Sequence, residues 1–200
     1  MDPEIYVFPN IKSAPLKILA STLLFGVVLV VMGLLLPRLP GPRLWASVDR
    51  SLSIGPLNVQ WAHILSIALG YALFIYWSYQ AWLATHQKNT VEDPTLHRPT
   101  CLLETGFYAR ARHPMYGMFI LANAGLGLAM NSVYGLAFGL LSLGLFVLNG
   151  IFEERAALIR MFGEQYQAYM QRVRRRYFTP AQAVSLVLIL ALNMLGVVLG

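Results

Sequence analysis

The strongest constraint on this chain is a series of apolar runs that contain no Asp, Glu, Lys or Arg and are long enough to cross a bilayer. A spanning helix needs about 20 mainly apolar residues. The first run covers residues 18–36 and ends at Pro37, which cannot continue a helix. It is too long for the core of a signal peptide, and no small-residue cleavage site follows it. We therefore predict a membrane-spanning helix here.

Four further runs each predict another spanning helix. The third and fourth runs are separated only by Asn131-Ser132, and so short a break makes the two helices antiparallel neighbours. Glycines recur along both arms of this hairpin, and small residues let membrane helices approach closely. We expect one all-α domain over residues 1–200, an integral membrane bundle of about five transmembrane helices. The four runs are 61–83, 115–130, 133–152 and 181–199.

The scarcity of charge supports a membrane location and excludes a soluble fold. Only 12% of the residues are charged, whereas soluble domains carry roughly 25%. The formal net charge of +6 does not indicate nucleic acid, because the basic residues lie beside apolar runs, where they meet anionic lipid headgroups. We therefore expect the lipid bilayer as a partner, and no nucleic acid.

The distribution of Lys and Arg predicts the orientation. If the N-terminus is cytoplasmic, twelve of the 15 basic residues lie on the cytoplasmic side and three on the other, as the positive-inside rule requires. Two polar segments, residues 85–113 and 153–179, then lie together at the cytoplasmic feet of the hairpin. We expect a functional site there.

The first polar segment brings cations to the start of a helix. Pro114 suits the first helical position, so Arg110, Arg112 and His113 crowd a helix N-terminus that is already partly positive. Cations together with free backbone N–H groups form a ready anion site. The alternative is that the arginines only follow the positive-inside rule and touch lipid phosphate.

The second polar segment opens with two adjacent acids, Glu153 and Glu154. Neighbours on a helix point about 100° apart, so one acid can face the hairpin while the other faces water or Arg155. The alternative is a plain interfacial cap. After this pair, apolar residues recur at helical spacing, which predicts a cytoplasmic amphipathic segment with a bend at Gly163.

No motif in the sequence predicts a metal or nucleotide site. The four histidines lack zinc-type spacing, and there is no glycine-rich phosphate loop. We therefore expect no metal. The histidines are His63, His86, His97 and His113.

Taken together, the two polar segments resemble the isoprenylcysteine carboxyl methyltransferase and phospholipid methyltransferase superfamily of integral membrane methyltransferases. The resemblance covers about residues 106–180, which we take as the core, and leaves 181–199 as an extra C-terminal span. Two blocks carry it, in order and flanking the hairpin. They are Gly106, Tyr108 and Arg112-His113-Pro114-Met115-Tyr116, then Glu153-Glu154, Leu158, Phe162-Gly163, Tyr166, Tyr169 and Pro180.

The resemblance implies S-adenosylmethionine as cofactor and a lipid or prenylated-cysteine type acceptor. It implies that Tyr108, His113, Pro114 and Tyr116 belong to the cofactor pocket and that Glu153 and Glu154 close its other side. Our anion argument suggests that the carboxylate of the cofactor meets Arg112 or His113. The catalytic candidates are Glu153, Glu154 and Arg112.

Two departures from the family pattern leave alternatives open. Asn149 stands where carboxyl-methylating members often carry an arginine, so a carboxylate, an amine, a thiol or another lipid group remains open as acceptor. The extra span is either an anchor or a contact for a partner subunit. The alternative function is therefore a non-catalytic accessory subunit of a membrane complex that retains the methyltransferase fold.

Overall fold

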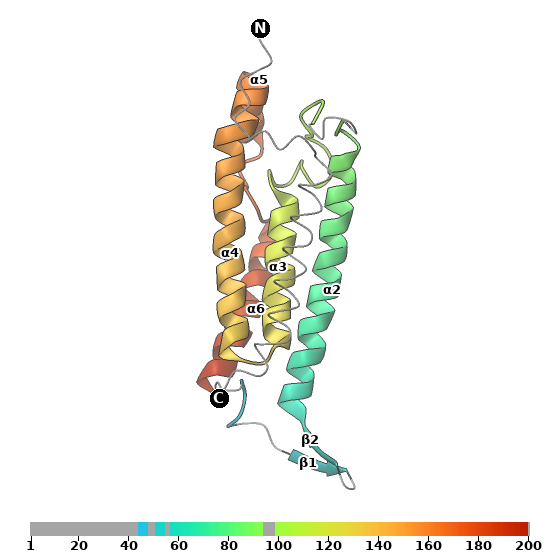
Figure 1. The fold of residues 1–200 in the computed structure, drawn as a ribbon, viewed down its shortest axis with the longest axis vertical. Coiled ribbons are helices and arrows are strands. Elements are labelled where there is room, and N and C mark those ends of the chain that lie inside the picture. Colours follow the sequence, from blue (N-terminus) through green and yellow to red (C-terminus); the bar gives the residue numbers. More distant parts are fainter. Residues whose placement is uncertain (1–43, 48–50, 55–56, 94–98, 200) are drawn as a thin grey trace, which may run out of the picture.

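The computed structural model describes residues 44–47, 51–54, 57–93 and 99–199. The predicted first span, 18–36, lies outside the described residues, as does the N-terminus whose side of the membrane was predicted. The described chain forms a small β-hairpin and a helical bundle (Figure 1). The elements are β1 (Ser51–Ile54), β2 (Leu57–Gln60), α2 (Trp61–Asn89), α3 (Pro114–Ala129), α4 (Val133–Glu153), the π-helical turn η2 (Glu154–Leu158), α5 (Ile159–Arg172) and α6 (Pro180–Val198).

The predicted helical membrane bundle is confirmed. Among the described helices, α2, α4 and α6 are long and apolar enough to cross a membrane, while α3 is apolar but has only 16 residues. The predicted run 61–83 underestimates α2, which has 29 residues and is therefore about 43 Å long. Its last turns extend past the roughly 30 Å of a hydrocarbon core. The antiparallel hairpin of β1 and β2 was not predicted.

The helical hairpin of α3 and α4 forms as the sequence predicts. Asn131 adopts a left-handed conformation with φ of 48°, which asparagine tolerates better than most residues. The Ser132 side chain then caps α4 by accepting a hydrogen bond from the backbone N–H of Gly135 at 3.3 Å. A Cβ on Gly127 would lie 2.3 Å from the carbonyl oxygen of Gly135, so the two helices approach too closely there for a side chain.

α3 is the centre of the bundle. It lies between α2 and α4 in Figure 1, and α6 packs against it as well. On the α6 side, Ile120 and Leu121 form a buried cluster with Leu186 and Ile189. The predicted extra span is therefore part of the core of this chain.

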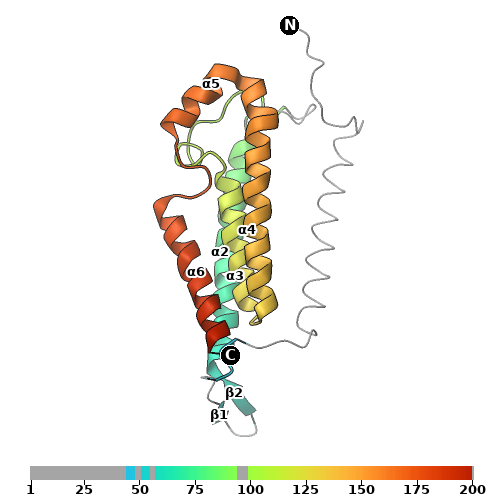
Figure 2. The same cartoon turned by 90° about the vertical axis from the view of Figure 1, so that its left-hand side faces the viewer.

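The bundle places the polar segments at one end. The C-terminal end of α2, the start of α3 and the end of α4 lie at the same end of the bundle, and α5 lies at this end as well (Figure 2). Gly163, with φ of 52° and ψ of −125°, interrupts α5, which confirms the predicted bend. Beyond α5, residues 173–179, which we call the strap, lead back to α6.

Candidate functional site

The strap lies across the start of α3 and is bound to it through the backbone. The N–H groups of Arg112 and His113 donate to the carbonyls of Arg175 and Arg176 at 3.0 and 2.7 Å. The guanidinium of Arg112 also donates to the carbonyl of Val173 at 3.0 Å. These contacts join residues about 61 positions apart in the chain. The strap therefore holds Arg112 and His113 in place without the help of a ligand.

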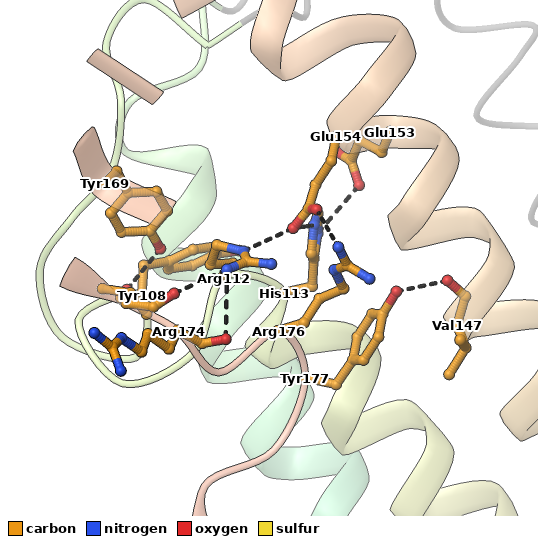
Figure 3. Close-up of polar contacts among 11 residues, drawn as sticks. Tyr108, Arg112, His113, Val147, Glu153, Glu154, Tyr169, Arg174, Arg176 and Tyr177 are labelled. Atoms are coloured by element: carbon orange, nitrogen blue, oxygen red, sulfur yellow. Dashed lines mark hydrogen bonds and ion pairs between the residues drawn. The ribbon is translucent and has the colours of Figure 1, made fainter. Parts of the chain in front are cut away.

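Glu154 is the centre of the site (Figure 3). Its Oε1 atom accepts from Nε of Arg112 at 2.8 Å and lies 3.1 Å from Nε2 of His113, and its Oε2 atom lies 3.0 Å from a terminal nitrogen of Arg176. The Glu154 side chain is only 4% exposed. The cations at the start of α3 were predicted to need an anion, and the chain supplies one itself.

The pairing fixes the charges of this cluster. Burial alone would raise the pKa of Glu154, but hydrogen bonds from His113 and Arg112 outweigh burial and lower that pKa to about 2. Burial alone would lower the pKa of His113, but hydrogen bonds with Glu153 and Glu154 outweigh it and raise that pKa above 6.5. Glu154 is therefore ionised at neutral pH, and the positive form of His113 is favoured.

Glu153 has a different environment from its neighbour. Its side chain is 38% exposed, and its Oε2 atom lies 3.5 Å from Nδ1 of His113. It also interacts with Tyr116 on α3, whose side chain interacts in turn with Asn149 one turn earlier in α4. Of the two predicted acids, Glu154 is occupied by three cations, whereas Glu153 remains accessible.

Aromatic rings complete the wall of the site. The imidazole of His113 stacks on Tyr116, with ring centroids 5.5 Å apart and planes within 4°, and lies 5.8 Å from the ring of Tyr177. The Tyr177 hydroxyl donates to the carbonyl of Val147 at 2.5 Å, which ties the strap to α4 (Figure 3). A Cβ on Gly150 would lie 2.6 Å from this ring, so Gly150 makes room for it.

Tyr108 enters the site from the loop before α3. Its carbonyl accepts a hydrogen bond from the hydroxyl of Tyr169 on α5 at 2.7 Å. Burial, followed by the negative charge of Glu153, raises the pKa of the Tyr108 hydroxyl. Tyr108 is therefore neutral and held between the loop and α5. Pro114 occupies the first position of α3, as predicted.

The structure thus brings the predicted site residues to one end of the bundle, around His113 and the two acids. Arg110 and Arg155, in contrast, are exposed. Sequence reasoning did not assign Arg176 and Tyr177 to the site. A usable signal was their place at the end of the basic run, four and three residues before Pro180, respectively.

The residues present fit a polar ligand that carries both charges. Two buried polar atoms near the cluster, the Tyr166 hydroxyl and Nε of Arg176, have no hydrogen-bond partner among the residues that the structure describes. Unpaired buried donors are costly, so an acceptor group on a ligand would be favoured there. Glu153 offers an accessible carboxylate for a positive group. Within the described ranges, no three His, Cys, Asp or Glu side chains are grouped to hold a metal ion.

Together, the apolar bundle and the polar cluster at one of its ends define an integral membrane protein with a built site. The family model for phospholipid methyltransferases matches residues 61–165, more than half of the chain. The chain therefore belongs to the phospholipid methyltransferase family, a family of membrane methyltransferases, as the resemblance predicted. Comparison with curated proteins gives no match, and comparison with solved structures gives none either.

Proposed function

We propose that this chain is an S-adenosylmethionine-dependent membrane methyltransferase that acts on a lipid or a lipid-modified acceptor such as a prenylated cysteine. The family supports the transferase class. The observation that carries the proposal is the unequal use of the two acids. Glu154 holds Arg112, His113 and Arg176 together, and this leaves Glu153 accessible beside a wall of aromatic rings.

Each predicted residue has a role in this proposal. The cofactor supplies a methyl group on a positively charged sulfur. Glu153 would attract its sulfonium or ammonium group, while the unpaired donors of Arg176 and Tyr166 suit its carboxylate. Arg112 and Glu154 fix the geometry of the pocket. The remaining cofactor-binding residues, which form its walls, are Tyr108, His113, Pro114 and Tyr116.

The same arrangement bears on how the acceptor is prepared for methyl transfer. An amine acceptor must lose a proton before it can react, and an accessible carboxylate can take that proton. Glu154 is unsuited to this, because three cations occupy its carboxylate. Glu153, whose side chain is 38% exposed, is the proton acceptor that we propose for an amine. A carboxylate or thiolate acceptor would require no base, and the site would then act by orienting it and excluding water.

Calorimetry with S-adenosylhomocysteine on the purified protein in lipid nanodiscs tests the proposal. We expect binding by the wild type and at least tenfold weaker binding by His113→Ala. The matched control is His86→Ala, because His86 is exposed on α2. Absence of any binding heat in the wild type would refute the proposal and favour a non-catalytic accessory subunit. Labelled S-adenosylmethionine with a membrane extract would then identify the acceptor.

A further inference from the structure

A glutamine on α2, outside the two blocks that carry the family resemblance, holds the loop that leads into the site. The side-chain amide of Gln87 makes two hydrogen bonds to this loop. Its Nε2 atom donates to the carbonyl of Thr105 at 2.9 Å, and its Oε1 atom accepts from the backbone N–H of Phe107 at 3.1 Å. One amide therefore holds the backbone on both sides of Gly106.

The conformation of Gly106 shows how closely the amide and the loop fit. Gly106 has φ of +60°, in the left-handed region that favours glycine. A Cβ at this position would lie 2.3 Å from Nε2 and 2.6 Å from Oε1 of Gln87. The loop can turn against the amide only because residue 106 has no side chain.

The loop that Gln87 holds, residues 105–107, is connected directly to the site. Phe107 packs against the buried cluster that Ala81 and Ala84 of α2 form with Met118 of α3, and the carbonyl of Tyr108 accepts the hydrogen bond from Tyr169. The segment is thus held by α2 on one side and by α5 on the other. Arg112, which pairs with Glu154, follows only four residues after Tyr108.

We propose that Gln87 is a positioning residue for the cofactor pocket: its amide holds the Gly106 turn, and through it the placement of Tyr108 and of Arg112. This rests on the proposed function. Gln87 touches no group that we assign to the cofactor, so its effect is exerted through the loop. It gives α2, which the two blocks leave out, a part in forming the site.

The test is the substitution Gln87→Met, which removes both hydrogen bonds while keeping the length and helix propensity of the side chain. The matched control is Gln80→Met, two turns earlier in α2. We expect S-adenosylhomocysteine to bind Gln87→Met about threefold to tenfold more weakly, as for the loss of one or two partly exposed hydrogen bonds. The melting temperature and the affinity of Gln80→Met should stay at the wild-type values.

Amide hydrogen exchange supplies a readout that does not need the cofactor. Loss of the Gln87 amide should raise exchange in residues 105–113, at Phe107 above all, and leave α3 and α4 unchanged. Gln87→Glu keeps the acceptor for Phe107 but places a carboxylate against the carbonyl of Thr105, so its affinity should lie between the wild type and Gln87→Met.

A double-mutant cycle tests whether the two residues act through one contact. Gly106→Ala should weaken binding by itself, and adding Gln87→Ala should weaken it by less than the product of the two separate effects. Wild-type affinity and loop exchange in Gln87→Met would overturn the proposal and leave the function intact. Absence of binding by the wild type would overturn the function, and the role of Gln87 with it.

Discussion

Glu153 and Glu154 are neighbours in the sequence, yet their side chains lie in different environments in the fold. Glu154 is buried among Arg112, His113 and Arg176, whereas Glu153 is 38% exposed. The difference follows from the turn of about 100° between successive helical residues. Removing the charge of Glu154 should therefore affect the protein differently from removing the charge of Glu153.

We expect Glu154→Gln to lower the free energy of unfolding by about 3 kcal/mol, because it leaves buried cations without their counter-charge. Glu153→Gln should cost less than about 1 kcal/mol, as expected for a more exposed pair, and should instead weaken binding of S-adenosylhomocysteine. Denaturant unfolding in detergent and calorimetry measure the two effects. Equal loss of stability in both variants would contradict the prediction that Glu154 stabilises the fold more than Glu153 does.

The protonation of His113 should make stability depend on pH. Folding raises its pKa above 6.5, so its contribution is complete below pH 6.5 and is lost as pH rises through the raised pKa. The melting temperature of the wild type should therefore fall relative to that of His113→Gln as the pH rises above about 6.5. Parallel curves for the two proteins would mean that His113 does not titrate in this range.

At the scale of elements, the α3–α4 hairpin depends on the absence of side chains where its arms meet. The carbonyl of Gly135 leaves no room for a Cβ on Gly127, whereas a Cβ on Gly144 would meet nothing within 4 Å. A buried hydrogen bond of 2.7 Å from Asn123 to Ser142 joins the same two helices. Such contacts hold membrane helices together, because lipid is as apolar as the helix interface.

Gly127→Ala should therefore reduce the free energy of unfolding by about 1–3 kcal/mol, the usual cost of overpacking. Gly144→Ala is the matched control on the same hairpin and should change it little. Thermal unfolding in one detergent compares the two. Backbone freedom alone favours alanine over glycine in a helix, so a loss at Gly144→Ala as large as that at Gly127→Ala would show that the close approach at Gly127 is not the cause.

The elements show what a sequence of this kind reveals. Pro114, the Asn131-Ser132 break and Gly163 each act through local backbone chemistry, so the helix start, the hairpin and the bend were predictable. The end of α2 at Asn89 was not, because hydropathy changes at the bilayer surface while helical hydrogen bonds continue into water. Nor does local pattern show which arginine of the basic run reaches Glu154, since Arg176 does so from 22 residues away.

For the molecule as a whole, labelling of a single thiol can determine the orientation in the membrane. Cys101 is the only cysteine in the chain, and it is exposed in the connection between α2 and α3, at the site's end of the bundle. If this end is cytoplasmic, a membrane-impermeant thiol reagent should leave Cys101 unlabelled in intact cells and label it after permeabilisation. Labelling of intact cells would invert the predicted orientation.

The role of α6 is the other question at this scale, because the family match ends at residue 165. Ile189 is 3% exposed and packs against α3, whereas its neighbour Leu188 is 58% exposed. Replacing a large buried side chain by alanine usually costs about 2–5 kcal/mol in a water-soluble core. In a membrane, lipid solvates the apolar side chains of the unfolded helix, so the cost comes mainly from the lost packing contacts. We therefore expect about 1–2 kcal/mol for Ile189→Ala and almost none for Leu188→Ala.

Because α6 begins immediately after the strap, the same change should reach the site. Ile189→Ala should weaken S-adenosylhomocysteine binding together with stability, since the strap holds Arg112 and His113 through the carbonyls of Arg175 and Arg176. Calorimetry and thermal unfolding of Ile189→Ala and Leu188→Ala measure both effects. If both variants kept wild-type stability and affinity, α6 would be an anchor or a contact for a partner subunit. A selective effect of Ile189→Ala would show that the last helix supports the site from the membrane.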